Sequence, residues 1–280
     1  MIPQKQRHTV LFAAAFLALG AGTASAAPVT FTASGAAQAN IQAAVDAFRL
    51  DLGALNANVA GSFGTGRREI NWDGVPDALS APNALPANFF NVNSPRGVVF
   101  TTPGSGFAVS ARQASGTPVR FGNVDVSYTA QFQTFSAERL FTATGSNIVD
   151  VNFFVPGTAT SALTRGFGSV FADVDAAGPT TISYFDVNNA LLDTLTVLAG
   201  PNGGLSFLGA DYGAAVVSRV RITAGNAPLG APESANDLVV MDDFVYAEPV
   251  TVPEPASLGL LVLGLGLAST ARLSASRRRR

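Results

Sequence analysis

Three reactive side-chain types are nearly absent from this chain of 280 residues. It contains no cysteine, and its single histidine, His8, and its single lysine, Lys5, both lie near the start. The rest of the chain therefore cannot carry a Ser-His-Asp or Cys-His nucleophile, a Schiff-base lysine or a zinc site of histidines and cysteines. It must also fold without disulfides. Carboxylates, arginines, hydroxyls, amides and one tryptophan remain for chemistry.

Positive charge is also scarce in the interior of the sequence. Residues 28–252 contain 18 acidic residues and ten arginines, a net charge of −8, whereas the whole chain has a formal charge of −2 because its two ends are basic. An acidic surface without lysine argues against nucleic acid and anionic lipid as partners. It is compatible with the binding of calcium or neutral sugars.

The amino-terminal end has the pattern of a secretory signal peptide. Lys5 and Arg7 form a basic start, residues 10–19 form an apolar run, and Ala-Ser-Ala at 24–26 is a small-residue cleavage site. We therefore predict a signal peptide over residues 1–26, which directs export and is then removed. An uncleaved anchor is the alternative, although the apolar run is short for a helix that spans a bilayer.

The carboxyl-terminal end combines a Pro-x-Pro motif, an apolar segment and a basic cluster, in that order. The two prolines fix φ and remove two backbone donors, so the motif should be extended and accessible. Residues 256–271 predict a helix of about 24 Å, a little short of the ~30 Å hydrocarbon core. A buried helix of the globular domain is the alternative, but it would normally have a polar face. The motif and the cluster consist of Val252, Pro253, Glu254 and Pro255, and of Arg277, Arg278, Arg279 and Arg280.

This order of elements resembles the PEP-CTERM sorting signal of Gram-negative bacteria that make exopolysaccharide. The resemblance covers residues 252–280. It implies export, a transmembrane helix before processing, recognition by an exosortase at the Pro-Glu-Pro motif, and then a location at the cell surface or outside the cell. The implied partners are the secretion machinery, the exosortase and exopolysaccharide.

Between the two ends, residues 27–250 predict one exported all-β domain. Short apolar runs are broken by Gly, Pro and Asn, which is typical of an antiparallel β-sandwich with many turns. One helix is expected near the start of the domain, with Ser34 as its cap and Gly53 at its end. The apolar residues that recur at helical spacing there are Ile41, Val45, Phe48 and Leu52.

The strands of this domain are predicted from short apolar or alternating segments. Asn188-Asn189 suits the positive φ values of a tight hairpin between two of them. Arg219 and Arg221 give one strand a wet face, and the last strand is apolar on both sides and should be central. The expected strands span residues 97–101, 106–111, 124–132, 148–155, 166–173, 181–187, 190–198, 205–208, 216–223 and 238–246.

Four blocks of this region resemble the ectodomains of exported bacterial β-sandwich proteins that carry the same sorting signal. The blocks lie at 166–175, 206–209, 219–222 and 242–244. The resemblance implies a jelly-roll-like sandwich similar to carbohydrate-binding modules, and it implies no established activity.

A calcium site is one interpretation of the aspartates. Asp173 and Asp175 are two residues apart at a strand end, so both carboxylates could chelate the ion, with Asp242 nearby. The alternative is that Asp173 and Asp175 accept hydrogen bonds within a turn. No other cofactor is expected.

Asp242 and Asp243 interrupt an otherwise apolar strand. Since side chains alternate along a strand, one of the two should face inward, where it needs a cation or an arginine. Arg219 or Arg221 could supply that ion pair.

Trp72 is the only tryptophan, and it lies beside Asp73 and Asp77 in a long connection rich in proline and asparagine. An exposed indole could stack on a sugar ring while the neighbouring aspartates bind hydroxyls. The alternative is a buried indole that anchors the connection.

These observations predict a surface or extracellular matrix protein with a structural or binding role, and not an enzyme. The first alternative is a calcium-dependent carbohydrate-binding module. The second is a secreted glycoside hydrolase that works with two carboxylates, although the sequence singles out no such pair.

Overall fold

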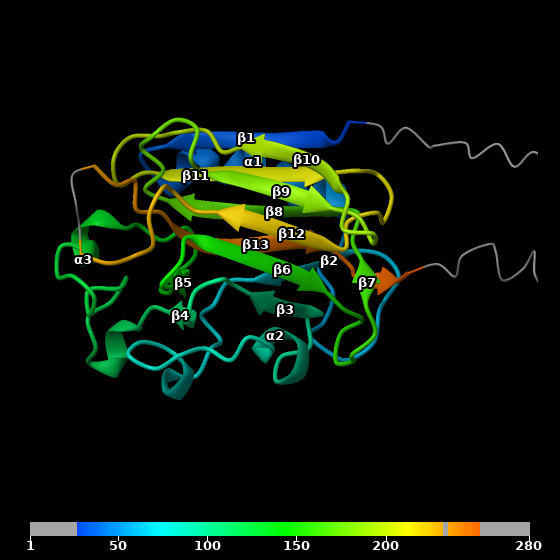
Figure 1. The fold of residues 1–280 in the computed structure, drawn as a ribbon, viewed down its shortest axis with the longest axis horizontal. Helices are drawn as coiled ribbons and strands as arrows, with labels where there is room; N and C mark the ends of the chain where they lie inside the picture. Colours follow the sequence, from blue (N-terminus) through cyan, green and yellow to red (C-terminus); the bar gives the residue numbers. More distant parts are fainter. Residues whose placement is uncertain (1–26, 232–234, 253–280) are drawn as a thin grey trace, which may run out of the picture.

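The computed structural model describes residues 27–231 and 235–252, which form a mostly β structure of antiparallel sheets with few helices (Figure 1). The predicted signal peptide and the sorting signal beyond Val252 lie outside the described residues. Within the described ranges, no helix is both long and apolar enough to cross a membrane.

Two large sheets and one small sheet make up the structure. The seven-stranded sheet has the order β1 (Val29–Gly35), β11 (Leu205–Asp211), β8 (Gly166–Ala172), β13 (Val240–Ala247), β5 (Phe141–Thr144) and β4 (Gly106–Val109), and β2 (Arg67–Ile70) also pairs with β13. The five-stranded sheet has the order β10 (Leu191–Thr196), β9 (Thr181–Phe185), β12 (Arg219–Thr223), β6 (Ile148–Phe153) and β3 (Val98–Thr101). The small sheet pairs β14 (Val250–Thr251) with β7 (Ala162–Leu163).

The inner faces of the two large sheets share one aromatic core, as the sandwich prediction requires. Buried and partly exposed residues alternate along β9 and β12, so one face of each strand packs inward. Phe100 and Phe153 of the five-stranded sheet belong to the same buried cluster as Phe167 and Phe244 of the seven-stranded sheet.

Helix α1 (Gln38–Leu52) covers the other face of the seven-stranded sheet, where it contacts β1, β11 and β13 (Figure 1). Its buried residues are the four that the spacing predicted: Ile41, Val45, Phe48 and Leu52. Strands β8, β11 and β13 are therefore buried on both faces, whereas the edge strand β1 stays partly exposed. The close approach of α1 to the sheet requires glycine on the two strands below Phe48. A Cβ on Gly168 would lie 2.9 Å from Phe48 Cε1, and one on Gly209 would lie 3.0 Å from Phe48 Cδ1.

The two ends of α1 differ in how well the sequence predicted them. Gly53 ends the helix with φ of 97°, as expected. Ser34 does not cap its start, because Ser34 lies in β1 and its hydroxyl donates to the Ala199 carbonyl. Instead, the Asn40 side chain accepts a hydrogen bond of 3.0 Å from the Ala37 N–H.

Most predicted strands are confirmed within a few residues, but the strand predicted over 124–132 is wrong. That segment is a turn followed by the short helix α3 (Tyr128–Gln131). The Asp125 carboxylate accepts hydrogen bonds from the N–H and the hydroxyl of Ser127, which favours a turn. Tyr128 and Phe132, four residues apart, are then buried on one side. Strands β1, β2, β5, β7 and β14 were not predicted.

The remaining helical segments lie in the connections around β3, β4 and α3. They are α2 (Phe89–Val92) and two 3₁₀ turns, η1 (Asp77–Leu79) and η2 (Gln113–Ser115). Strand β14 and the start of β1 lie at the same end of the molecule (Figure 1).

Candidate functional site

Trp72 is a buried anchor and not an exposed platform for a sugar. Its side chain is 1% exposed and stacks on Phe141 with ring centroids 4.1 Å apart. Phe90 and Phe244 contact it edge-on, and its indole N–H donates to the Asp242 carbonyl at 2.8 Å. The sugar-stacking interpretation of this residue is therefore wrong.

The two aspartates beside Trp72 also have structural partners. The Asp73 carboxylate accepts hydrogen bonds from the backbone N–H groups of Glu138 and Arg139. Asp77 forms ion pairs with Arg112 and Arg139, and the hydrogen bond from Arg112 is the main reason that the pKa of Asp77 is lowered. Both residues thus fasten the long connection to the segment that precedes β5.

The three aspartates proposed for calcium do not share partners. Asp173 accepts hydrogen bonds from the Gln131 amide and the Gly203 N–H, and Asp242 lies in β13 with partners of its own. Asp175 instead approaches Asp237, whose Oδ1 accepts a hydrogen bond from the Asp175 N–H at 3.3 Å. In the described part of the chain, no group of three or more His, Cys, Asp and Glu side chains is arranged to hold a metal ion. Calcium binding stays a prediction.

Asp237 is an unusual carboxylate. It is 4% exposed, and its Oδ2 atom has no hydrogen-bond partner. Burial, together with the neighbouring Asp175, raises its pKa to about 7. The carboxylate therefore favours a bound proton or a cation near neutral pH.

A β-bulge in β13 brings Asp242 and Asp243 to the same face of the sheet. The pairing of β13 with β8 shifts register between Met241 and Phe244, so one extra residue interrupts the alternation. Asp242 Oδ2 accepts the Phe135 N–H at 2.6 Å, and the Ser136 hydroxyl lies within hydrogen-bond distance of both carboxylates. The expectation that the two side chains point to opposite faces is therefore wrong.

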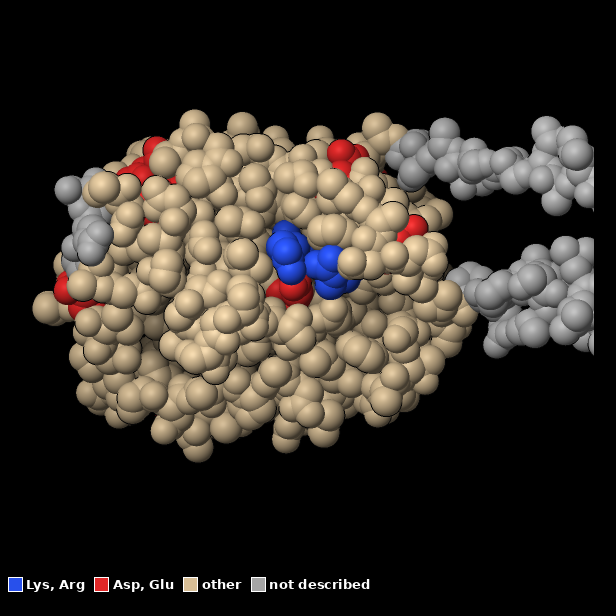
Figure 2. Space-filling model, viewed as in Figure 1, with Lys and Arg blue, Asp and Glu red and all other residues tan. Residues whose placement is uncertain are grey.

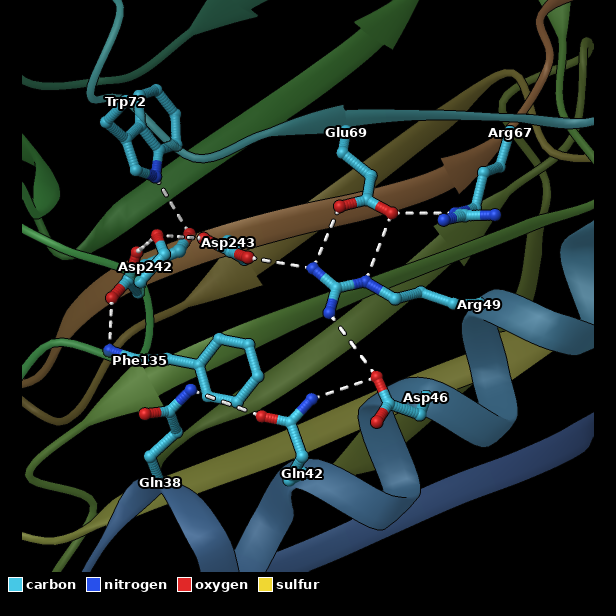
Figure 3. Close-up of polar contacts among 11 residues, drawn as sticks. Gln38, Gln42, Asp46, Arg49, Arg67, Glu69, Trp72, Phe135, Asp242 and Asp243 are labelled. Atoms are coloured by element: carbon cyan, nitrogen blue, oxygen red, sulfur yellow. Dashed lines mark hydrogen bonds and ion pairs between the residues drawn. The ribbon is translucent and has the colours of Figure 1, made fainter. Parts of the chain in front are cut away.

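Arg49 of α1 is the cation that pairs with Asp243 (Figure 3). Its Nη2 lies 3.1 Å from Asp243 Oδ2 and 2.8 Å from Glu69 Oε2 of β2. Glu69 also binds Arg67, and Asp46 lies 3.5 Å from Arg49 Nη1. Arg219 and Arg221, which the sequence suggested for this role, both pair with Asp150 on the five-stranded sheet.

The charged side chains around Arg49 form what we call the ion-pair network: Asp46, Arg67, Glu69, Asp242 and Asp243. Within it, the pKa values of Arg49, Asp242 and Asp243 depend on one another. Burial, and then the charge of Asp243, raise the pKa of Asp242 well above its ordinary value. Burial also raises the pKa of Asp243, while Ser136, Asp242 and Arg49 oppose that shift. For Arg49, burial lowers the pKa, but the hydrogen bond and charge of Glu69, helped by Asp243, outweigh it and raise the pKa overall. Arg49 is thus held as a cation between two carboxylates.

The network forms the floor of a cleft of about 360 Å³, which we call the polar cleft. Its walls come from α1, the connection that follows α1, β2, and the segments around residues 96 and 135. Figure 3 shows the Gln38 and Gln42 amides continuing the hydrogen-bond network from Asp46 along α1. The lining residues are Gln38, Gln42, Arg49, Leu55, Asn56, Asn58, Glu69, Asn71, Arg96, Phe135, Ser136 and Asp243.

The lining of the polar cleft is suited to hydroxyl-rich ligands. Five amide side chains offer both donors and acceptors, and guanidinium and carboxylate groups offer stronger charge-assisted bonds. Asn58 and Asn71 are exposed. The floor is rigid because each charged group in it has several partners.

The outer face of the five-stranded sheet carries few charged side chains among the described residues, and a smaller pocket of about 260 Å³ lies there beside Asn152, Asn189 and Arg219. Figure 2 shows that face as almost uncharged, with two blue side chains beside a red one near its middle. Arg219 and Arg221 of β12 are neutralised there by Asp150 of β6. This face therefore carries no extended basic patch of the kind that binds nucleic acid.

The sequence did not reveal the cleft, although it contained two signals. Arg49 and Asp46 are polar residues three apart on a helix whose apolar side was recognised, and Arg67-Arg68-Glu69 is a charged run that becomes β2. Neither signal shows that these residues meet Asp243, which lies far away in the sequence.

Comparison with known proteins adds no assignment. No protein-family model matches the chain, and neither the curated proteins nor the solved structures contain a significant match.

Proposed function

We propose that this chain is an exported protein of the cell surface or extracellular matrix, with a jelly-roll-like sandwich that binds saccharide in the polar cleft. The terminal signals support export and envelope sorting. The observation that carries the binding role is the cleft itself: amide, guanidinium and carboxylate groups line one concavity above a fixed ion-pair floor. Groups that are held in place before binding lose little entropy when a ligand arrives.

Binding without turnover is the form of this proposal that the geometry favours. Glu69 and Asp243 are two carboxylates in one cleft, as a glycoside hydrolase needs. However, both accept a hydrogen bond from the same Arg49 Nη2, and the other oxygen of Asp243 accepts one from Ser136. A carboxyl group occupied in this way is poorly placed to protonate a glycosidic oxygen.

A calcium-dependent carbohydrate-binding module remains the second candidate. It is favoured by one carboxylate outside the polar cleft, Asp237. The unpartnered Oδ2 of Asp237, beside Asp175, is the kind of oxygen that a calcium ion would satisfy. If this candidate is correct, chelation will lower the melting temperature of the protein, and no change on chelation will exclude it.

Saccharide binding can be tested with variants that leave the network intact. In the full-length chain, Asn58→Ala combined with Asn71→Ala removes two exposed amides of the cleft, for which no protein partner is seen among the described residues. We expect about tenfold or greater loss of affinity on a panel of oligosaccharides, because each lost hydrogen bond is worth ~1 kcal/mol. Isothermal titration calorimetry measures the affinity.

Gln113→Ala is the matched control, since Gln113 is an exposed amide in η2 outside the cleft. Equal affinities for the wild type and the double variant would place any saccharide site elsewhere. No binding on any oligosaccharide would remove the binding role. Release of reducing sugar would favour the hydrolase.

A further inference from the structure

The polar cleft contains one arginine whose charge is not neutralised by a carboxylate. In the described ranges, only Arg96 and Arg120 form no ion pair. Arg120 donates to the carbonyls of Thr129 and Phe132, so it has a structural use. Arg96 lies in the cleft and, among the described residues, has neither a carboxylate partner nor a comparable set of carbonyl partners.

The guanidinium of Arg96 is held in place but is poorly satisfied. It lies 5.1 Å from the Phe90 ring centroid, and its Nη1 donates to the Ser94 hydroxyl at 2.5 Å. Its Nε is buried and has no hydrogen-bond partner. A half-buried cation with unused N–H groups normally costs stability unless an acceptor satisfies it.

The surroundings of Arg96 destabilise its positive charge as long as no anion is bound. Burial is the main cause that lowers the pKa of Arg96; Tyr246 opposes the shift, and the nearby Arg68 cation adds to it. Glu248 cannot help Arg96, because both of its carboxylate oxygens bind Arg68. An anionic ligand at Arg96 would offset both effects.

We propose that the polar cleft recognises an acidic saccharide, with the carboxylate of a hexuronic acid unit bound to the guanidinium of Arg96. This inference rests on the proposed saccharide binding and adds the charge of the ligand. Because Nε is buried and Nη1 donates to Ser94, the ligand carboxylate would accept hydrogen bonds at the Nη2 end of the guanidinium. The exposed amides of Asn58 and Asn71 remain for the hydroxyls of the same or the next sugar.

The ligand should carry isolated charges and not a dense array of them. The other arginine of the cleft, Arg49, is already bound to Glu69 and Asp243, so the cleft has a single free cation among the described residues. Residues 28–252 carry a net charge of −8, which repels polyanions such as nucleic acid. One carboxylate per sugar, with neutral hydroxyls between charges, fits this arrangement.

The test compares an acid with its own neutral derivative. The full-length chain is titrated calorimetrically with α- and β-linked hexuronic acid tetrasaccharides and with their methyl esters, which keep the hydroxyls and lose the charge. We expect the acid to bind at least tenfold more tightly than its ester at low salt, and this preference to shrink in high salt. A sulfated neutral tetrasaccharide tests whether any anion suffices, and binding of it as tight as that of the uronate would contradict a carboxylate-specific site.

Arg96→Gln should remove the preference, so that acid and ester bind alike, and Arg96→Lys should restore part of it. Arg112→Gln is the control, because Arg112 is exposed, lies outside the cleft, and leaves Asp77 paired with Arg139. Circular dichroism establishes that each variant is folded. A wild-type chain that binds the ester as tightly as the acid, or an Arg96→Gln variant that keeps the preference, would overturn the inference while leaving saccharide binding in place. If no saccharide of either kind binds, the proposed function fails as well.

Discussion

At the scale of single residues, the buried carboxylates are stabilised by hydrogen bonds and ion pairs. Asp242 and Asp243 share Ser136, and Asp243 also has Arg49. Glu248 and Arg68 form a fully buried ion pair with two hydrogen bonds. Asp237 departs from this pattern, since one of its oxygens is buried without a partner.

Asp237 should make the stability of the protein depend on pH. Its folded pKa of about 7 lies above the unfolded value of ~3.9, so the folded state holds the proton more tightly. This contribution is fully present below pH ~4 and is lost as pH rises to about 7. Asp237→Asn should therefore make the decline between pH 5 and pH 7 smaller, and at pH 8 the variant should be more stable than the wild type by ~1 kcal/mol or more. Urea unfolding at several pH values measures this.

Asp125→Asn is the control for that experiment. The Ser127 hydroxyl and N–H lower the pKa of Asp125, so its contribution to stability is lost only as pH falls through the acidic range. It should leave the slope between pH 5 and pH 7 unchanged. An Asp237→Asn variant with the slope of the wild type would contradict the prediction.

At the scale of elements, spacing and alternation predicted the parts whose burial follows local periodicity. Helix α1 has the predicted buried face, and β12 has the predicted solvent-facing and core-facing sides. The sequence failed where another effect decided. Asp125 and Ser127 form a turn before α3, and β2 pairs with β13 although it carries charged residues, with Glu69 bound to both Arg67 and Arg49. Charged residues in a strand give no apolar alternation to recognise.

The packing of α1 on its sheet should depend on the small size of Gly209. A Cβ there would lie 3.0 Å from the Phe48 ring and 3.1 Å from Phe207 Cζ. Gly209→Ala should therefore destabilise the protein by ~1–3 kcal/mol through overpacking. Urea unfolding, followed by the fluorescence of the buried Trp72, measures the change.

Gly74→Ala is the matched control, because a Cβ at Gly74 would meet nothing within 4 Å. It should change stability by no more than ~0.5 kcal/mol. Equal effects of the two substitutions would show that α1 can move away from β11 at little cost.

At the scale of the whole molecule, the sequence predicted a mostly β body, which the structure confirms, and export, which stays a prediction, but it could not predict the cleft. The cleft joins α1, β2, the segment at 135–136 and β13, and these parts are far apart in the chain. No local pattern shows that Glu69 and Asp243 meet at Arg49. The interpretation of Trp72 as a sugar platform was wrong for the same reason, since the burial of its indole depends on distant contacts.

Export and sorting predict the mass of the mature protein. The form recovered from the cell envelope or the medium should begin at Ala27 and should lack the apolar segment 256–271 and the arginine cluster. Intact-mass spectrometry measures both ends. Replacing Pro253 and Pro255 by alanine should leave the carboxyl-terminal segment attached without changing the amino terminus. Full-length chain in the cytosol would contradict the proposal.

The bulge in β13 has a consequence for how this strand can change in length. Removal of one residue between Met241 and Phe244 would restore strict alternation, and Phe244 would stay opposite Ser169 with its ring in the core. Only one of the two aspartates would then remain beside Ser136 on the other side of the sheet. The extra residue therefore lets one strand present two adjacent carboxylates where regular pairing would allow one, and a deletion there should cost a carboxylate while leaving the aromatic core in place.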